Sequence, residues 1–250
     1  MSIDPILKRF PKDRPPLPEG YEEIAYSEYA ENRKQENKIY SLSGYIEGWM
    51  HRCVARSGND IEPGQVLEIG AGTLNHLPFE SSYTDYDVIE PYDPFFDLAS
   101  NPSGIRNRFK DISEVPNELV YSRIFSVAVL EHVANLPEVI AVAGTHLVKG
   151  GVFQAGIPTE GGWLWGFMNR KVMGFFFRRR TGLDYAPLMD HEHINTANEI
   201  EALINYCFRD VKKKRFPLPF FSLSFYTYFE ASDVYIERCN DIIEYYAQSL

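Results

Sequence analysis

Cysteine and long hydrophobic runs are both scarce in this sequence. Its three cysteines, Cys53, Cys207 and Cys239, are odd in number and far apart, so we expect neither a zinc-binding spacing nor a disulfide framework. No apolar run is long enough to cross a bilayer, and the proline-rich residues 1–23 lack the apolar stretch of a signal peptide. We therefore expect a protein of the reducing cytoplasm.

An excess of positive charge is also missing. The 250 residues include 25 Lys and Arg against 35 Asp and Glu, which gives a formal net charge of −10. Because phosphate contacts need clustered cations, this charge disfavours nucleic acid as a partner. Hydrophobic residues make up 44% and charged residues 24%, which is typical of a folded globular protein. The length suits one α/β domain with additional elements.

The segment 1–58 is predicted to form an extended lead and lid helices outside the main domain. Residues 1–20 are expected to be extended, and the charged residues 21–37 to be helical. The apolar residues between 45 and 54 follow the spacing of one buried helical face, and Gly58 ends that second helix.

The segment 59–250 is predicted to form the main domain. Short apolar segments alternate there with helical or connecting segments, which is typical of a parallel sheet covered by helices. The expected strands are residues 65–69, 87–90, 106–111, 124–130, 152–157, 211–216 and 224–229. We therefore expect an α/β fold with a Rossmann-like, mostly parallel seven-stranded sheet. Residues 159–195 interrupt the alternation after the fifth strand and are interpreted as an insertion, and Thr196 and Glu199 after it form a capping-box pattern.

A glycine-rich turn follows the first predicted strand. Gly70, Ala71 and Gly72 stand where glycine lets the backbone turn sharply and approach a ligand closely. Glu90 ends the next strand, eighteen residues after Gly72. A carboxylate there can accept hydrogen bonds from both ribose hydroxyls of a nucleoside cofactor. The order strand, Gly-x-Gly, strand, acidic residue therefore predicts a nucleoside-cofactor site.

Two residues argue against a dinucleotide as that cofactor. Leu74 stands where dinucleotide sites have a third glycine, and Pro78 allows only a short helix after the turn. Both weaken the phosphate cradle that a helix N-terminus provides. Glu68 lies beside the same turn, near the place where a cationic ligand would lie. An NAD-type oxidoreductase remains an alternative.

Four segments then point to a family. LEIGAGT, DVIEP, VAVLEHV and LVKGGVFQAGIP follow one another over about ninety residues. They resemble the successive motifs of class I S-adenosylmethionine-dependent methyltransferases. The resemblance implies S-adenosylmethionine (SAM) as the cofactor and methyl transfer as the reaction. Leu74 and the short helix after it depart from the family pattern.

The resemblance also implies roles for individual residues. Gly70, Ala71 and Gly72 would pass under the methionine part of SAM, Glu68 would help to hold its amino group, and Glu90 would bind the ribose. The other implied cofactor contacts are Pro91 and Tyr92 beside the adenine, Asp111 and Ile112 at the adenine edge, and Leu130 and Glu131 along the cofactor. The residues that would fold over the cofactor from the N-terminal segment are Tyr26, Tyr29 and Arg33.

Three histidines are candidates for a general base. Methylation of an alcohol requires loss of its proton, and histidine, with a free pKa of about 6.5, suits this task. His132 follows the fourth strand, whose carboxyl end faces the ligand crevice in open α/β sheets, and His191 and His193 lie just before a helix. Each of them could instead have a structural role. Residues 190–193 are too crowded to bind one ion together, so no metal site is predicted.

The insertion is interpreted as an acceptor-binding lid. Trp163 and Trp165 offer flat faces that pack on sugars, and Arg178, Arg179 and Arg180 add positive charge. Because arginine forks match phosphate and carboxylate groups, we expect an anionic small-molecule acceptor, such as a nucleotide- or lipid-linked sugar. A solvated helix face is the alternative. A peripheral membrane contact is a third interpretation, since residues 175–177 are aromatic and lie beside these arginines.

A fainter resemblance concerns the acceptor. IPTEGGWLWGFMNRK and DHEHINTANEI resemble methyltransferases encoded with bacterial surface-polysaccharide pathways, such as O-antigen or capsule synthesis. That resemblance implies O-methylation of a sugar. A cofactor-binding protein without catalytic activity remains an alternative. The lack of an Asn/Asp-Pro-Pro-Tyr motif disfavours methylation of amide or exocyclic amine nitrogen.

Overall fold

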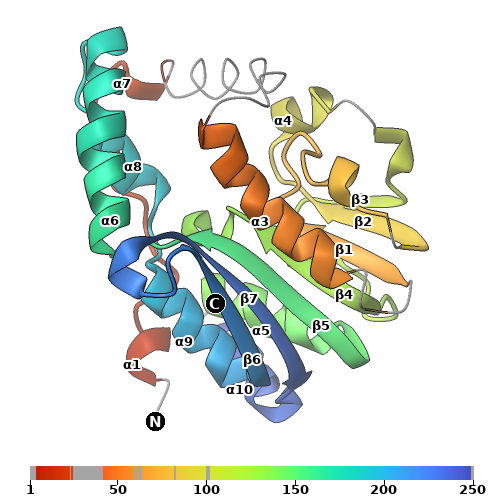
Figure 1. The fold of residues 1–250 in the computed structure, drawn as a ribbon. Helices are drawn as coiled ribbons and strands as arrows, with labels where there is room; N and C mark the ends of the chain where they lie inside the picture. Colours follow the sequence, from red (N-terminus) through yellow and green to blue (C-terminus); the bar gives the residue numbers. More distant parts are fainter. Residues whose placement is uncertain are drawn as a thin grey trace.

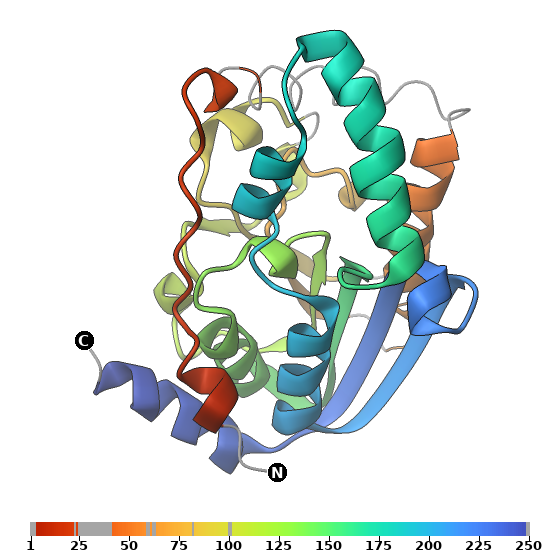
Figure 2. The same ribbon diagram turned by 90° about the vertical axis from the view of Figure 1, so that its left-hand side faces the viewer.

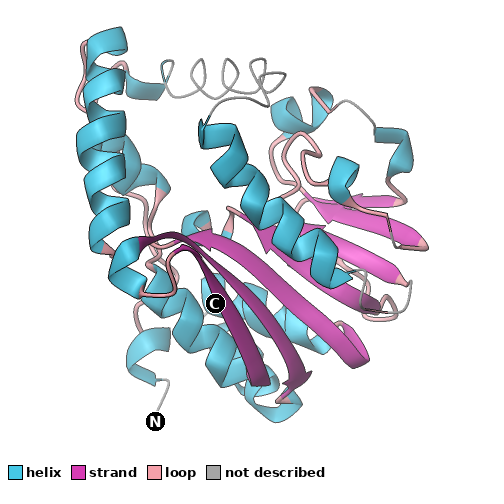
Figure 3. Ribbon diagram, in the orientation of Figure 1, coloured by secondary structure: helices cyan, strands magenta, loops and turns pink. Residues whose placement is uncertain are grey.

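The computed structural model describes residues 4–22, 24, 42–58, 61, 64–81, 83–99 and 102–248. Within these residues, seven strands form one sheet with helices on both faces (Figures 1 and 3). The predicted α/β class and mostly parallel sheet are confirmed. Most of the helix predicted over residues 21–37, with its three candidate cofactor contacts, lies outside the described residues.

The strand order places a crossover at the centre of the sheet. The strands are β1 (Gln65–Ile69), β2 (Asp85–Ile89), β3 (Asn107–Phe109), β4 (Tyr121–Val127), β5 (Leu147–Pro158), β6 (Phe208–Pro217) and β7 (Ser224–Val234). They are arranged β3-β2-β1-β4-β5-β7-β6. The first five run parallel, whereas β7 lies antiparallel between β5 and β6. Ligands of open α/β sheets bind where the strand order reverses, which here is between β1 and β4.

The central strands end in register. Ile69 pairs with Ile89 of β2 on one side and with Ser126 of β4 on the other. The residues that follow β1, β2 and β4 therefore emerge together at one edge of the sheet.

One face of the sheet is covered by α3 (Leu42–Gly58). Val54 of this helix is fully buried and shares a core cluster with Val66 of β1 and Phe125 of β4. The helix also ends at Gly58 as predicted.

The opposite face is covered by α5 (Leu136–Thr145), α9 (Ala197–Cys207) and α10 (Ile236–Ala247) (Figure 1). Ile140, Leu203 and Ile242 of these helices are fully buried in the larger core cluster. The predicted capping box begins α9: Thr196 accepts a hydrogen bond from the Glu199 amide, and Glu199 accepts one from the Thr196 amide at 2.9 Å.

Short helices lie in the connections between the strands. They are η1 (Leu77–Phe79), α4 (Asp93–Asp97), η2 (Pro102–Gly104), η3 (Ile112–Glu114), η4 (Leu130–His132) and, between β6 and β7, η6 (Phe221–Leu223). The helix after the glycine turn is only the three-residue η1, with Pro78 inside it. This agrees with the prediction of a short helix.

The N-terminal residues form a strap across the surface. After α1 (Asp4–Leu7), residues 8–20, here called the N-terminal strap, run extended beside α8 and the end of β4 (Figure 2). Leu7 is anchored in the core, where its carbonyl accepts a hydrogen bond from Tyr246 at 3.0 Å. The Lys12 amide donates to the carbonyl of Ala134 at 3.0 Å. The strap thereby holds the segment that follows β4.

Residues 159–195 fold as a helical arm. The helices α6 (Trp163–Gly166), η5 (Phe167–Met173) and α7 (Gly174–Thr181) follow one another without a break, and η5 is a π-helical turn (Figures 1 and 2). Gly182, with a φ of 79°, ends α7, and α8 (Ala186–Glu192) leads back toward the sheet.

Several boundaries differ from the sequence prediction. β4 ends at Val127, because Ala128 adopts a φ of 54° and turns the chain into η4. β5 begins at Leu147 rather than 152, because Leu147 pairs with Tyr121. β7 extends to Val234, which pairs with Phe208 of β6. None of the described helices is long and apolar enough to cross a bilayer.

Candidate functional site

A cavity of about 940 Å³ opens where the central strands end. This cavity is here called the central cavity, and two groups of residues line it. The first group follows β1, β2 and β4 and includes Gly70, Gly72, Glu90 and Val129. The second comes from the strap, α7 and α8 and includes Arg14, Arg180, His191, Glu192 and His193. Segments far apart in the sequence therefore form one chamber.

The glycine turn forms the wall of the cavity after β1. Gly70 and Gly72 have φ angles of 74° and 52°, in the region that favours glycine. A Cβ atom on Gly70 would lie 2.4 Å from a methyl carbon of Val129. The turn thus needs glycine at Gly70 for both backbone conformation and close packing.

Glu90 ties the two strand ends together. Its carboxylate accepts hydrogen bonds from the Gly72 amide at 2.7 Å and from the Tyr92 amide at 2.8 Å. The residue is buried yet lines the cavity. Each carboxylate oxygen has a second lone pair, so the group can hold the turn and still accept from a ligand hydroxyl.

Glu68 is a buried carboxyl group at the cavity wall. It accepts a hydrogen bond from Tyr86 at 2.7 Å. Burial, opposed by this hydrogen bond and reinforced by the nearby charges of Glu80 and Glu90, raises the pKa of Glu68 to about 8. The side chain is therefore mainly protonated at neutral pH until a cation approaches it.

The other predicted cofactor residues divide into two sets. Pro91 and Tyr92 line the cavity, as do Ala71 and Phe95. Asp111, Ile112, Leu130 and Glu131 lie outside its lining. Asp111 caps η3 by accepting from the Ser113 amide at 2.9 Å, and the last three are buried.

His132 is held in a charged network at the end of β4. Its Nδ1 lies 2.7 Å from the Glu192 carbonyl oxygen, and Arg14 donates to the His132 carbonyl oxygen at 3.0 Å. Burial opposes its charge, but the hydrogen bond to Glu192 and the charges of Glu131 and Glu192 raise the pKa of His132. Burial also opposes the charge of Glu192, yet the hydrogen bond and charge of His132, together with Arg14, lower its pKa to about 2.

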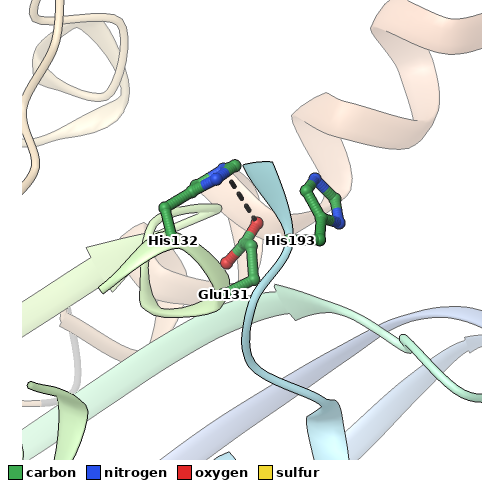
Figure 4. Close-up of side chains that lie close together, drawn as sticks. All are labelled: Glu131, His132 and His193. Atoms are coloured by element: carbon green, nitrogen blue, oxygen red, sulfur yellow. Dashed lines mark ion pairs between the residues drawn. The ribbon is translucent and has the colours of Figure 1, made fainter. Parts of the chain in front are cut away.

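His193 lies against His132. Their ring centroids are 4.9 Å apart and nearly perpendicular. The Nδ1 of His193 is 2.5 Å from a carboxylate oxygen of Glu160, and the ring packs on Trp165 at 5.6 Å. In Figure 4, His132 and His193 approach the buried carboxylate of Glu131 from either side.

His191 lines the cavity, whereas most of the predicted acceptor-binding residues of the arm do not. The Nδ1 of His191 is 2.7 Å from the Pro15 carbonyl oxygen of the strap. Arg180 also lines the cavity, whereas Arg178 and Arg179 are exposed outside it. Trp163 is 65% exposed and stacks on Phe167 rather than on the cavity wall. The predicted acceptor residues are thus not gathered at one point.

A second series of buried polar side chains in contact with one another was not predicted from the sequence. The Nδ1 atoms of His51 and His76 are 2.9 Å apart, and His76 Nε2 lies 2.6 Å from Glu80. Glu80 in turn pairs with the buried Arg123. His51 and His76 line the cavity beside the glycine turn. The only sequence signal for these contacts was that His76 and Glu80 are four residues apart.

The fold can be compared with known proteins. No protein-family profile matches the sequence, and no curated protein sequence does. A solved SAM-dependent methyltransferase from Clostridium acetobutylicum is similar in structure, with a TM-score of 0.54 and 12% identity. The match covers 83% of this chain and 98% of that one.

Two further structures share the architecture. The plantazolicin methyltransferase BpumL, solved with S-adenosylhomocysteine (SAH) and a monoazolic desmethylPZN analogue, has a TM-score of 0.54 and 14% identity over 83% of this chain and 92% of its own. The N-methyltransferase NodS from Bradyrhizobium japonicum, solved with SAH, has a TM-score of 0.51 and 14% identity over 75% and 86%. The chain therefore has the fold of class I SAM-dependent methyltransferases.

Proposed function

We propose that the protein is a SAM-dependent methyltransferase that methylates an oxygen atom of a polar, anionic small molecule. The observation that supports this most is the central cavity, whose lining includes both the glycine turn with Glu90 and the three candidate histidines. A nucleoside cofactor and a second reactant can therefore meet inside one chamber.

The cofactor half of the proposal uses the residues after β1 and β2. Glu90 accepts from the ribose hydroxyls, and Tyr92 lies beside the adenine. Glu68 faces the cationic end of SAM, where loss of its proton would give an attractive charge. The glycine turn leaves room for the methionine part, because Gly70 and Gly72 have no side chains.

The acceptor half uses the end of β4 and the arm. Methyl transfer is an in-line displacement, in which the acceptor oxygen bonds to the methyl carbon as the carbon–sulfur bond breaks. Positioning of the nucleophile on that axis can supply ~7–11 kcal/mol. The acceptor proton leaves toward the histidine group of His132, His191 and His193, a step typically worth ~10²–10⁴-fold in rate.

Charge suggests the acceptor class. Arg14 and Arg180 line the cavity of a protein whose net charge is −10. Arginine forks bind phosphate or carboxylate groups in two-point contacts. We propose a nucleotide- or lipid-linked sugar from surface-polysaccharide synthesis as the first acceptor to test. The free thiols of Cys53, Cys207 and Cys239 suit a cytoplasmic setting.

The arm suggests a peripheral membrane contact for a lipid-linked acceptor. Trp163, Phe167, Phe175 and Phe176 are 65%, 47%, 60% and 56% exposed, respectively. Exposed arginines follow them in α7, and each basic residue near an anionic surface contributes about 1 kcal/mol. We expect co-sedimentation with vesicles that contain phosphatidylglycerol and none with uncharged phosphatidylcholine vesicles.

Calorimetry separates the proposal from its alternatives. SAM and SAH should each bind with one site per chain, and NADH should not bind. Glu90→Ala should weaken SAM binding roughly 10–100-fold, because charge-assisted hydrogen bonds contribute about 1.5–3 kcal/mol each. Binding of NADH but not of SAM would favour the oxidoreductase alternative.

Turnover then tests catalysis. Production of SAH from SAM in the presence of candidate glycosyl phosphates would distinguish an enzyme from a cofactor-binding protein without activity. The control is the same mixture without the acceptor, which reports unproductive SAM hydrolysis.

A further inference from the structure

We propose that Glu131, His132 and His193 bind a divalent transition-metal ion such as Zn²⁺. The site lies at the end of the central cavity where the proposed acceptor would bind. The three residues offer ligand atoms that all lie within 4.8 Å of one another. They come from two segments about sixty residues apart in the sequence and converge on one point (Figure 4). This proposal departs from the sequence analysis, which weighed residues 190–193 and predicted no metal site.

Hydrogen bonds prepare both imidazoles as ligands. A carbonyl oxygen only accepts hydrogen bonds, so the contact to Glu192 places the hydrogen of neutral His132 on Nδ1. The carboxylate of Glu160 does the same for His193. In each ring the lone pair is then on Nε2. A histidine that ligates a metal typically donates its other N–H to a carbonyl or carboxylate in this way, which fixes the tautomer and the ring orientation.

The carboxylate between them has His132 as an ion-pair neighbour but accepts no hydrogen bond at Oε2 within the described residues. Glu131 is 2% exposed, and its Oε2 is buried without a hydrogen bond in the described part of the chain. Its Oε1 lies 3.8 Å from Nε2 of His132, too far for a hydrogen bond. A buried carboxylate without hydrogen bonds is costly unless a cation compensates it. A bound ion would provide that compensation.

The backbone of Glu131 is held firmly, although Oε2 of its side chain has no hydrogen bond within the described residues. Its carbonyl oxygen accepts hydrogen bonds from the amides of Ile194 and Asn195, both at 3.0 Å. Asn195 also donates to the carbonyls of Leu130 and Val133. These contacts fasten the segment of His193 to the segment of Glu131, so the ligand set is built into the fold.

The donor types indicate which ion fits. Two imidazoles and one carboxylate are the ligand set of catalytic zinc sites and of non-haem iron sites, which keep positions open for water or substrate. Zinc–ligand distances of ~2.0–2.1 Å place tetrahedral ligands about 3.4 Å apart. The atoms here therefore need to move together by about an ångström, which side-chain rotation can provide.

The inference extends the proposed function and rests on it for the ion's role. His132 and His193 line the cavity, so the ion's open positions face the acceptor. The acceptor hydroxyl would bind the ion and release its proton to solvent. Its oxygen would then form a bond to the methyl carbon as the carbon–sulfur bond breaks, leaving neutral SAH. This route would replace the proton transfer to His132 and His193 that is proposed above, because both rings would then act as ligands.

Metal binding is tested without activity. The full chain, freed of any affinity tag and treated with EDTA, is titrated with Co²⁺ and followed by visible absorption, and Zn²⁺ is then added as a competitor. We expect one Co²⁺ per chain with weak d–d bands, displaced by one Zn²⁺. A strong thiolate-to-cobalt band would place the ion at a cysteine and would overturn the proposal.

Variants locate the site. Glu131→Gln, His132→Asn and His193→Asn should each weaken Zn²⁺ binding roughly 100-fold or more, and Glu160→Ala about 10–100-fold through loss of the Nδ1 contact. His191→Asn is the matched control, since His191 lines the same cavity outside the ligand set, and it should leave Zn²⁺ affinity unchanged. Circular dichroism and SAH binding report whether each variant is folded.

The outcomes separate the two proposals. Loss of Zn²⁺ binding in the three ligand variants but not in His191→Asn supports the metal site. Equal Zn²⁺ affinity in all folded variants overturns it, even if SAM binds. A chain that binds Zn²⁺ at these residues but neither SAM nor SAH would instead retain the metal site and refute the proposed function.

Discussion

At the scale of residues, the site combines three carboxyl groups that are stabilised in different ways. Glu90 accepts hydrogen bonds from two backbone amides, and the carboxylate of Glu192 forms ion pairs with His132 and Arg14. Glu68 has only the Tyr86 hydroxyl and lies near two other carboxylates. The raised pKa of Glu68 makes this part of the cavity wall sensitive to pH.

The raised pKa of Glu68 predicts a pH dependence of stability. Between its ordinary pKa of 4.5 and about 8, the folded chain keeps a proton that the unfolded chain has lost. The free energy of unfolding should therefore fall as pH rises through this window, by at most ~1.4 kcal/mol per pH unit from this group. Urea unfolding at several pH values should show a flatter profile for Glu68→Gln. Parallel profiles for variant and parent would contradict the assignment.

Two glycines make a matched comparison. Gly70 and Gly150 have φ angles of 74° and 82°, but a Cβ on Gly70 would meet Val129 at 2.4 Å, and one on Gly150 would meet nothing within 4 Å. Gly150→Ala should cost about 1–2 kcal/mol from backbone strain alone. Gly70→Ala should cost a further ~1–3 kcal/mol from overpacking and should weaken SAM binding. Chemical denaturation measures the free energy of unfolding, and calorimetry measures SAM affinity. Equal losses of unfolding free energy in the two variants would show that the Val129 side chain moves aside at no energetic cost.

At the scale of elements, the strap and the start of α9 meet at one carboxylate. Glu199 completes the capping box with Thr196 and also pairs with Lys12 and Arg9 of the strap. Lys12 donates further to the carbonyl of Ile194, next to His193. The position of the segment that contains His193 therefore depends on a helix cap and on the strap residue Lys12, which is 182 residues away from Ile194 in the sequence.

Removal of the cap should be measurable. Thr196→Ala should lower the free energy of unfolding by about 1 kcal/mol, within the ~0.5–2 kcal/mol typical of such caps. Thr145→Ala is the control. Thr145 is the last residue of α5, and its hydroxyl donates to the Val142 carbonyl of the same helical turn. Urea denaturation should show the larger loss for Thr196→Ala. A loss as large for the control would mean that the capping box adds nothing specific.

At the scale of the whole molecule, the cavity joins segments that pack in different parts of the fold. The sheet edge forms one side, and the arm with the strap forms the other (Figure 2). A ligand that contacts both sides should stabilise the folded chain as a unit.

Ligand binding should therefore raise the melting temperature. SAH at 100 times its dissociation constant should stabilise the chain by ~2.7 kcal/mol, which corresponds to roughly 5–10 °C at ~2–4 °C per kcal/mol for a chain of this size. Thermal unfolding with SAH, with NADH and without ligand measures this. An equal shift with NADH would argue against a SAM-specific site.

Much of the fold could be predicted because its signals are local. The buried strands are continuous apolar runs, the turn after β1 needs glycine, and the start of α9 has its capping pattern in four residues. Boundaries were harder, since they depend on partners. Leu147 joins β5 because Tyr121 lies beside it, and Val127 ends β4 because Ala128 adopts a left-handed conformation.

The candidate site could be predicted only where its residues lie on consecutive strands of the sequence. Glu90 and the glycine turn were found because the next strand returns the chain to the same edge of the sheet. Arg14, Glu160 and His51 gave no signal that linked them to the cavity. Packing brings Arg14 and His51 to the cavity and places Glu160 against His193, which lines it.

The sequence alone determined the α/β sheet, the glycine turn and the acidic residue after β2, because hydrophobic spacing and backbone freedom act over a few residues. Only the tertiary structure decided which polar groups share the cavity. Glu131, His132 and His193 converge because Asn195 and the strap fasten two distant segments together. Such contacts arise from long-range packing, in which the geometry of the whole fold sets the distance between side chains.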